Sequence, residues 1–167
     1  MFSKVIRSAS DRLTSLYLHL ATIFMVILVF STFMQVFTRY VLNASWPWTE
    51  ELARYSFIWM NMLGAAAGFR KASLVAVDNM VKIAKGFVLF SMKTIIMAAT
   101  FAIGFILFWY GNKLIGLVGS YPSVTMRIPM GFIHAASPAS GIGFMLNALA
   151  GFIEAIEVYK KGGAENE

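Results

Sequence analysis

Long runs without a charged residue constrain this chain more than any other feature. Residues 13–38 contain 26 consecutive positions without Asp, Glu, Lys or Arg, and residues 128–153 contain another 26. A helix needs about 20 apolar residues to cross the hydrocarbon core of a bilayer, which is about 30 Å thick. The first run is also longer than the roughly 7–15 apolar residues of a cleaved signal peptide. Both runs are therefore predicted to be membrane-spanning helices that stay in the protein.

The composition agrees with a chain that lipid covers. Hydrophobic residues make up 59% of the chain and charged residues 13%, and the mean hydropathy is +0.70. Soluble domains carry about 25% charged residues, so this chain has too little polar surface to cover a globule in water. It also contains no cysteine, which excludes disulfides, thiolate metal sites and thiol catalysis. The expected fold class is an all-α integral membrane protein.

Two further apolar stretches complete the expected architecture, and one of them is irregular. The second stretch begins with Glu50, Glu51 and Arg54, and its uncharged part, residues 55–69, is only 15 residues long. It spans a bilayer only if its charged turn lies among the headgroups or against protein. The predicted spans of a single domain, residues 1–167, are residues 13–38, 50–69, 86–112 and 128–153.

The parts between the spans also have expected structures. Residues 2–12 and 73–85 show apolar positions at helical spacing opposite charged ones, so they are predicted to be short amphipathic helices in the membrane plane. Residues 113–126 contain two glycines and a proline, which predicts an interfacial or partly re-entrant loop. Pro138 is expected to kink the last span.

Basic residues predict the orientation. The net charge of +6 is spread over short clusters, which favours contact with lipid headgroups over nucleic-acid binding. With four spans, the two termini and the 70–85 segment share one side and hold nine Lys and Arg residues. That side is predicted to be cytoplasmic, as in an inner-membrane-type protein.

The segment around the second helix start carries most of the candidate functional residues. Thr49 is a possible N-cap, and Glu50 and Arg54 form an i, i+4 pair. One interpretation is a capped helix start anchored at the interface. The other is a docking element for a second membrane subunit, because charges so close to hydrocarbon require partners. The candidate docking residues are Glu50, Glu51, Arg54, Asn61, Gly64 and Gly68; the candidate interfacial anchors are Trp46, Trp48, Trp109 and Tyr110.

No set of residues predicts catalysis or a cofactor. His19 and His134 each lie near the start of their spans, which run in opposite directions, so a shared haem or metal site is not expected. No phosphate-binding loop, Ser-His-Asp set or carboxylate pair is recognisable. The chain is therefore not expected to be an enzyme or to hold a cofactor.

Several sequence runs resemble one transporter family. They are FTRYVLN (residues 37–43), WTEELARY (48–55), IW (58–59), GAAAGFR (64–70) and PSVTMRIPM (122–130). Together with the length and the number of spans, they resemble the small (Q-type, DctQ-like) membrane subunit of tripartite ATP-independent periplasmic (TRAP) transporters. The segment SLVAVD (73–78) lacks a histidine that family members often carry there.

The resemblance implies a scaffold that does not itself transport. A large (M-type) membrane subunit would carry the substrate and sodium sites, and a periplasmic binding protein would deliver an organic acid such as a dicarboxylate or sialic acid. The small subunit would surround the large one and present a docking surface outside, where Arg39, Lys113 and Arg127 are the expected contacts. The alternatives are a self-sufficient four-helix exporter acting as a homo-oligomer and a redox subunit using the two histidines.

Overall fold

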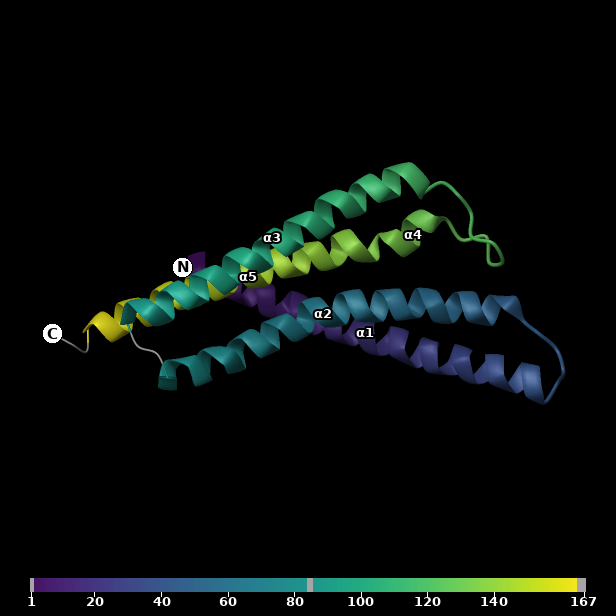
Figure 1. The fold of residues 1–167 in the computed structure, drawn as a ribbon, viewed down its shortest axis with the longest axis horizontal. Helices are drawn as coiled ribbons and strands as arrows, with labels where there is room; N and C mark the ends of the chain where they lie inside the picture. Colours follow the sequence, from purple (N-terminus) through teal and green to yellow (C-terminus); the bar gives the residue numbers. More distant parts are fainter. Residues whose placement is uncertain (1, 84–85, 165–167) are drawn as a thin grey trace.

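The computed structural model describes residues 2–83 and 86–164, and these residues form five α-helices (Figure 1). Outside the helices, the described residues include one isolated β-bridge, between Pro122 and Pro129. The helices are α1 (Phe2–Tyr40), α2 (Pro47–Ile83), α3 (Gly86–Val118), α4 (Met130–His134) and α5 (Ala136–Ala164).

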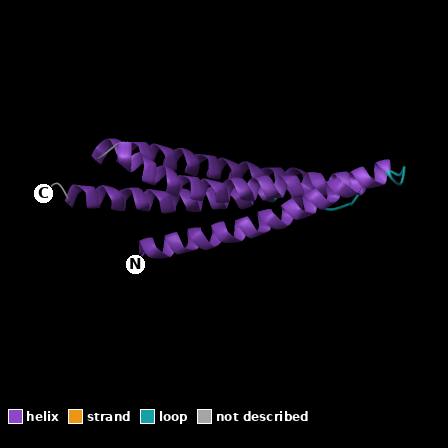
Figure 2. Cartoon of the chain, turned by 90° about the horizontal axis from the view of Figure 1, so that it is seen from below, coloured by secondary structure: helices purple, strands orange, loops and turns teal. Residues whose placement is uncertain are grey.

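The helices form two antiparallel hairpins. Helix α1 packs along α2, and α3 packs along α5, while α2 and α5 make most of the contacts that join the hairpins. Both views show an elongated bundle with the two chain ends at one end and the loops that follow α1 and α3 at the other (Figures 1 and 2). We call these the terminal end and the loop end. The loop end contains residues 41–46 and residues 119–129.

Three stretches are long and apolar enough to cross a membrane. They are Val5–Tyr40, Val88–Val118 and Met130–Glu157, and each contains one of the predicted spans at least in large part. Helix α2 is not among them, because charged residues at both ends leave only 15 uncharged positions, residues 55–69. The all-helical prediction is confirmed, whereas the count of four spans stays a prediction.

Helices α1, α2 and α3 are all longer than the predicted spans. Residues 2–12 form the first turns of α1, and residues 73–83 form the last turns of α2, so neither segment is a separate helix in the structure. Residues 113–118, predicted to belong to a loop, complete α3. The reason is that extending an existing helix adds one hydrogen bond per residue without a new nucleation step, and no proline interrupts these junctions. Residues 84–85, which end the predicted 73–85 segment, lie outside the described residues.

The last predicted span is broken near Pro138, as the sequence indicated. Helix α4 ends at His134 and α5 begins at Ala136. Proline has no backbone N–H, so the carbonyl four residues before it, that of His134, loses its helical donor. The series of helical hydrogen bonds resumes where the Ala139 N–H donates to the Ala135 carbonyl at 3.1 Å. The break therefore lies one turn before the proline that causes it.

Small residues form the contact between the helices. The core shared by the two hairpins contains Leu63, Ala66 and Ala67 of α2, all at most 1% exposed. A Cβ atom on Gly141 of α5 would lie 2.6 Å from the carbonyl oxygen of Gly104 on α3. Backbones in membranes approach this closely only where side chains are small.

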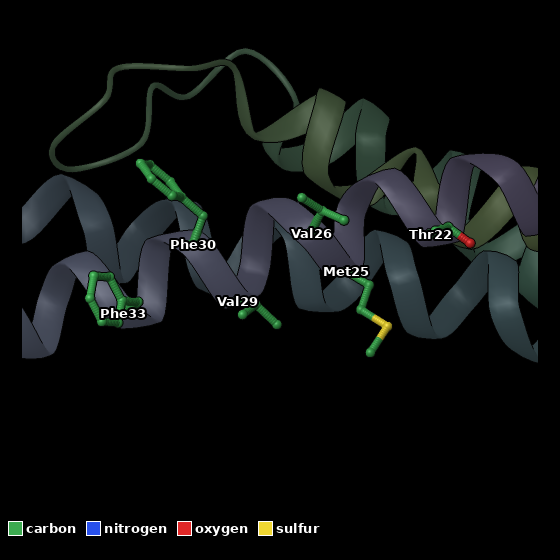
Figure 3. Close-up of a pocket in the computed structure, with 6 residues that line it drawn as sticks. All are labelled: Thr22, Met25, Val26, Val29, Phe30 and Phe33. Atoms are coloured by element: carbon green, nitrogen blue, oxygen red, sulfur yellow. The ribbon is translucent and has the colours of Figure 1, made fainter.

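Large apolar side chains cover the outside of the bundle instead. Val26 and Phe33 of α1 are more than 60% exposed, as are Ile95 and Leu117 of α3. Six residues of α1 line a shallow apolar depression: Thr22, Met25, Val26, Val29, Phe30 and Phe33 (Figure 3). An exposed apolar surface of this extent marks contact with lipid or with another protein.

Candidate functional site

The loop end is held together by Glu51, which lies just after the first turn of α2. One carboxylate oxygen, Oε2, accepts hydrogen bonds from the backbone amides of Thr125 at 3.0 Å and Met126 at 2.7 Å. The other oxygen, Oε1, accepts a hydrogen bond from the Tyr55 hydroxyl. Glu51 is 8% exposed. It therefore connects the first hairpin to the 119–129 loop of the second.

These contacts set the protonation of Glu51, which lies outside the three candidate spans. Burial raises the pKa of this carboxyl, but the hydrogen bonds from Tyr55 and from the two backbone amides have a larger, opposite effect. The net result is a pKa lowered from 4.5 to about 2. Hydrogen bonds to an ionised carboxylate favour the charged form. Glu51 is therefore an anion at neutral pH.

The 119–129 loop has an ordered backbone of its own. The Ser123 amide donates to the Ile128 carbonyl at 2.9 Å, and the Met130 amide donates to the Tyr121 carbonyl at 2.9 Å. Arg127 has a φ of 55°, a left-handed conformation that disfavours most side chains. Val124, at the tip, is 92% exposed. The loop is thus a fixed turn that presents its tip outward.

The predicted pair of Glu50 and Arg54 is confirmed. Arg54 Nη2 donates to Glu50 Oε1 at 2.8 Å, and both side chains are more than 60% exposed. An exposed i, i+4 pair contributes only about 0.3–0.5 kcal/mol. The prediction that Thr49 caps the helix was wrong: α2 begins at Pro47, and the Thr49 hydroxyl donates to the Trp46 carbonyl at 2.7 Å.

The polar and small stripe of α2 is largely open, and Asn61 and Gly64 border a shallow depression whose other wall is α1. No atom lies within 4 Å of a Cβ built on Gly64 or Gly68. The exposed amide of Asn61 donates to the Phe57 carbonyl of its own helix at 2.8 Å. The opposite side of α2 carries the buried core residues. The stripe is therefore available to a partner, and its docking role stays a prediction.

The remaining predicted residues lie on the surface. Arg39, in the last turn of α1, is exposed, as are Lys113 and Arg127. Among the described residues, none of these three cations forms an ion pair. The candidate anchors are also exposed: Trp46 and Trp48, whose ring centroids lie 6.0 Å apart, and Trp109 and Tyr110.

Sequence reasoning missed a charge cluster at the terminal end. Arg70 of α2 is buried, and its guanidinium donates to Asp11 of α1 at 3.1 Å and to Glu154 of α5 at 2.8 Å. Arg7 lies 2.8 Å from Glu157 and 3.7 Å from Glu154. The cluster could have been predicted from the opposite charges that lie at the same end of three predicted helices. The basic residues were instead interpreted only as markers of orientation.

A second polar group joins α1, α2 and α5 deeper in the bundle. The Asn147 side chain accepts hydrogen bonds from Ser10 at 2.7 Å and from Thr14 at 3.4 Å, and it donates to the Ala66 carbonyl at 2.8 Å. All of these side chains are buried. Asn147 therefore fixes three helices at one point, a role that an isolated polar residue in an apolar run does not reveal.

Within the described residues, the two histidines do not belong to a metal-binding cluster. No cluster of three or more His, Asp or Glu side chains suited to a metal ion occurs among the described residues. A nitrogen of the exposed His19 ring lies 2.6 Å from the Ser15 carbonyl of the preceding turn. His134 lies at the end of α4, next to the helix break.

These features define a helical membrane protein whose polar interior groups connect helices to one another. The family model described as "Tripartite ATP-independent periplasmic transporters, DctQ component" matches residues 28–158. The chain therefore belongs to the DctQ family, the small component of TRAP transporters, as its resemblance indicated. This family is a transporter component and not an enzyme family. A comparison with curated proteins finds no match.

Proposed function

We propose that this chain is the fixed scaffold subunit of a sodium-coupled TRAP transporter that imports an organic acid of the dicarboxylate or sialic acid class. A large membrane subunit carries the substrate and sodium, and a periplasmic binding protein delivers the substrate at the loop end. The chain crosses the inner membrane four times, with the uncharged part of α2 as the fourth span and both termini in the cytoplasm.

The observation that carries this proposal is the division of α2 into two faces. Its inner face is packed against α1 and α5, and it ends in the buried Arg70 cluster. Its outer face carries the exposed Asn61 and Gly68, and a Cβ on Gly64 or Gly68 would meet no neighbouring atom within 4 Å. Next to Asn61 and Gly64 this face is open as a shallow depression between α2 and α1. Exposed glycines on a membrane helix permit close approach by another helix. A partner on this face also explains how a helix with only 15 uncharged residues lies in the bilayer.

Rigid attachment of the two hairpins supports a scaffold role. Glu51 joins them at the loop end, and Arg70 and Asn147 join them toward the terminal end. Relative motion of the hairpins would break several buried hydrogen bonds at once, and each buried group left without a partner costs about 1–3 kcal/mol. A subunit built in this way is suited to holding a moving partner in place.

The test is recovery of the large subunit with this chain from detergent-solubilised membranes. Gly64→Leu and Gly68→Leu each place a bulky side chain on the outer face of α2, where an added Cβ meets no neighbouring atom within 4 Å. Overpacking a close interface costs about 1–3 kcal/mol, so we expect recovery to fall by about tenfold, which corresponds to 1.4 kcal/mol. Ala98→Leu, at an exposed position on α3, is the matched control.

Two results would contradict the proposal. Equal recovery with the glycine variants and the α3 control would show that the stripe faces lipid. Purification of this chain as a homo-oligomer that transports alone in liposomes would favour the self-sufficient transporter.

A further inference from the structure

The 119–129 loop and Glu51 together form a feature that neither the family nor the scaffold role explains. Glu51 is a buried carboxylate whose partners are the backbone amides of Thr125 and Met126 and the hydroxyl of Tyr55. The bonds to the two amides fix the backbone between the exposed Val124 and the exposed Arg127. A buried carboxylate that fixes the backbone of a loop indicates that the shape of the loop has a function.

We propose that Glu51 is a positioning residue that holds the tip of the 119–129 loop in the shape that docks on the periplasmic binding protein. This inference rests on the proposed function, because it takes the loop end to be the periplasmic face. The docking residues are Tyr121, Val124 and Arg127. Glu51 itself does not touch the partner.

The exposure of the tip supports a contact there. Val124 is 92% exposed and Tyr121 is 64% exposed, although both belong to a turn whose backbone is ordered. An ordered turn loses little conformational entropy when it binds, so preorganisation contributes directly to affinity. Tyrosine and arginine are also enriched among the residues that dominate binding energy at protein interfaces.

The charge at the loop end indicates the chemistry of the partner. Glu50 is paired with Arg54, and the ionised Glu51 is buried and hydrogen-bonded to the loop, so neither carboxylate is left for a partner. The exposed Arg39, Lys113 and Arg127 form no ion pair among the described residues. Complementary charge steers association between proteins. The partner surface is therefore expected to carry an apolar depression flanked by carboxylates.

A fixed turn favours a protein partner over a membrane surface. A loop that only dips among lipid headgroups gains from apolar and basic side chains, but it gains nothing from a defined backbone. Here the backbone is held by two bonds to Glu51 and by its own β-bridge. Contact with lipid is therefore treated as an outcome of the test.

The experiment measures binding of the fluorescently labelled periplasmic binding protein to the complex of this chain with the large subunit, held in lipid nanodiscs. We expect Glu51→Ala to raise the dissociation constant by about tenfold, with unchanged recovery of the complex. Glu51→Gln keeps an oxygen that accepts from the two amides, so an intermediate increase is expected. Glu50→Ala removes the neighbouring exposed carboxylate and leaves Arg54 without its partner, but it keeps the loop anchor. It is the control and should not raise the constant.

Two further measurements separate a positioning role from a general structural one. Hydrogen exchange at the Thr125 and Met126 amides should speed up in Glu51→Ala and stay unchanged in Glu50→Ala. Val124→Ser, which alters the tip without affecting the loop anchor, should also raise the dissociation constant. In the double variant, the loss of binding free energy should be smaller than the sum of the losses in the two single variants, because both substitutions act through the same contact.

Specific outcomes overturn the inference. Faster amide exchange in Glu51→Ala with an unchanged dissociation constant would show that the loop shape does not serve docking. An effect of Val124→Ser on the stability of the complex in nanodiscs, without an effect on binding, would identify the tip as a lipid contact. If the wild-type complex does not form or binds no binding protein, the proposed function fails, and the inference fails with it.

Discussion

Arg70 is the side chain on which the packing of the terminal end depends most. Its side chain is 4% exposed, and it bonds both to Glu154, whose side chain is 16% exposed, and to Asp11, whose side chain is 59% exposed. Replacing Arg70 by Gln removes the positive charge between the two carboxylates. We expect this substitution to lower the free energy of unfolding more than any neighbouring surface change.

The magnitude follows from the burial of each partner. Breaking a buried ion pair by removing one member costs about 3–5 kcal/mol, because the other charge stays buried. The bond to Asp11 is largely exposed and contributes at most about 1 kcal/mol. Glu154 also keeps Arg7 at 3.7 Å, which relieves part of the loss. We therefore expect a total near the lower limit, about 3 kcal/mol.

The assay is unfolding of the purified chain by titration with SDS in mixed micelles, followed by loss of helical circular dichroism. Lys71→Gln is the control, because Lys71 is the adjacent basic residue and is exposed. The double variant Arg70→Gln with Glu154→Gln removes both charges. It should recover about 2 kcal/mol relative to the single variant, since no unpaired buried charge remains.

Two results would refute this reasoning. A loss in Arg70→Gln no larger than that in Lys71→Gln would show that the cluster does not stabilise the bundle. Strict additivity in the double variant would show that Arg70 and Glu154 do not interact in the folded protein.

Two further predictions concern the packing of α5 and the acid sensitivity of the loop end. Gly141→Ala should lower the free energy of unfolding by about 1–3 kcal/mol, because the new Cβ would lie 2.6 Å from the Gly104 carbonyl oxygen. Gly116→Ala is the control in the same unfolding assay. It should be neutral or stabilising, because no neighbouring atom lies within 4 Å of its Cβ. The ionised Glu51 has a lowered pKa of about 2, so its contribution is complete above the ordinary value near 4.5 and is lost as the pH falls toward 2. Amide exchange of the 119–129 loop, corrected for the intrinsic pH dependence, should rise over that range in the wild type and not in Glu51→Gln; equal pH profiles would contradict the assignment.

The sequence was sufficient to predict features that depend on neighbouring residues. Uncharged runs identified α1, α3 and α5, because the length of such a run is set by bilayer thickness. The pair of Glu50 and Arg54 followed from the helical repeat alone. The break before α5 followed from the missing N–H of Pro138. Each of these depends on residues within one turn or one run.

Contacts between distant residues were beyond the reach of these patterns. Glu51 meets a loop 74 residues later in the chain, and Arg70 meets partners 59 and 84 residues away. Glu51 was expected to be a docking residue because charges so close to hydrocarbon require partners. Helical periodicity alone did not show which of Glu50 and Glu51 faces inward. In the structure Glu50 is exposed and Glu51 is buried, so adjacent carboxylates have different roles.

The locations of these polar contacts follow from the physics of the bilayer. Between helices in lipid the hydrophobic effect gives little attraction, because the lipid is as apolar as the side chains, so packing and hydrogen bonds must join the hairpins. A charged group near the bilayer centre is costly, whereas near the interface its cost is smaller. The charged contacts, Glu51 and Arg70, accordingly flank the uncharged part of α2, residues 55–69. The uncharged contact between Asn147 and the Ala66 carbonyl lies between them. The inner face of α2 therefore makes most of the contacts between the two hairpins, and its outer face stays open.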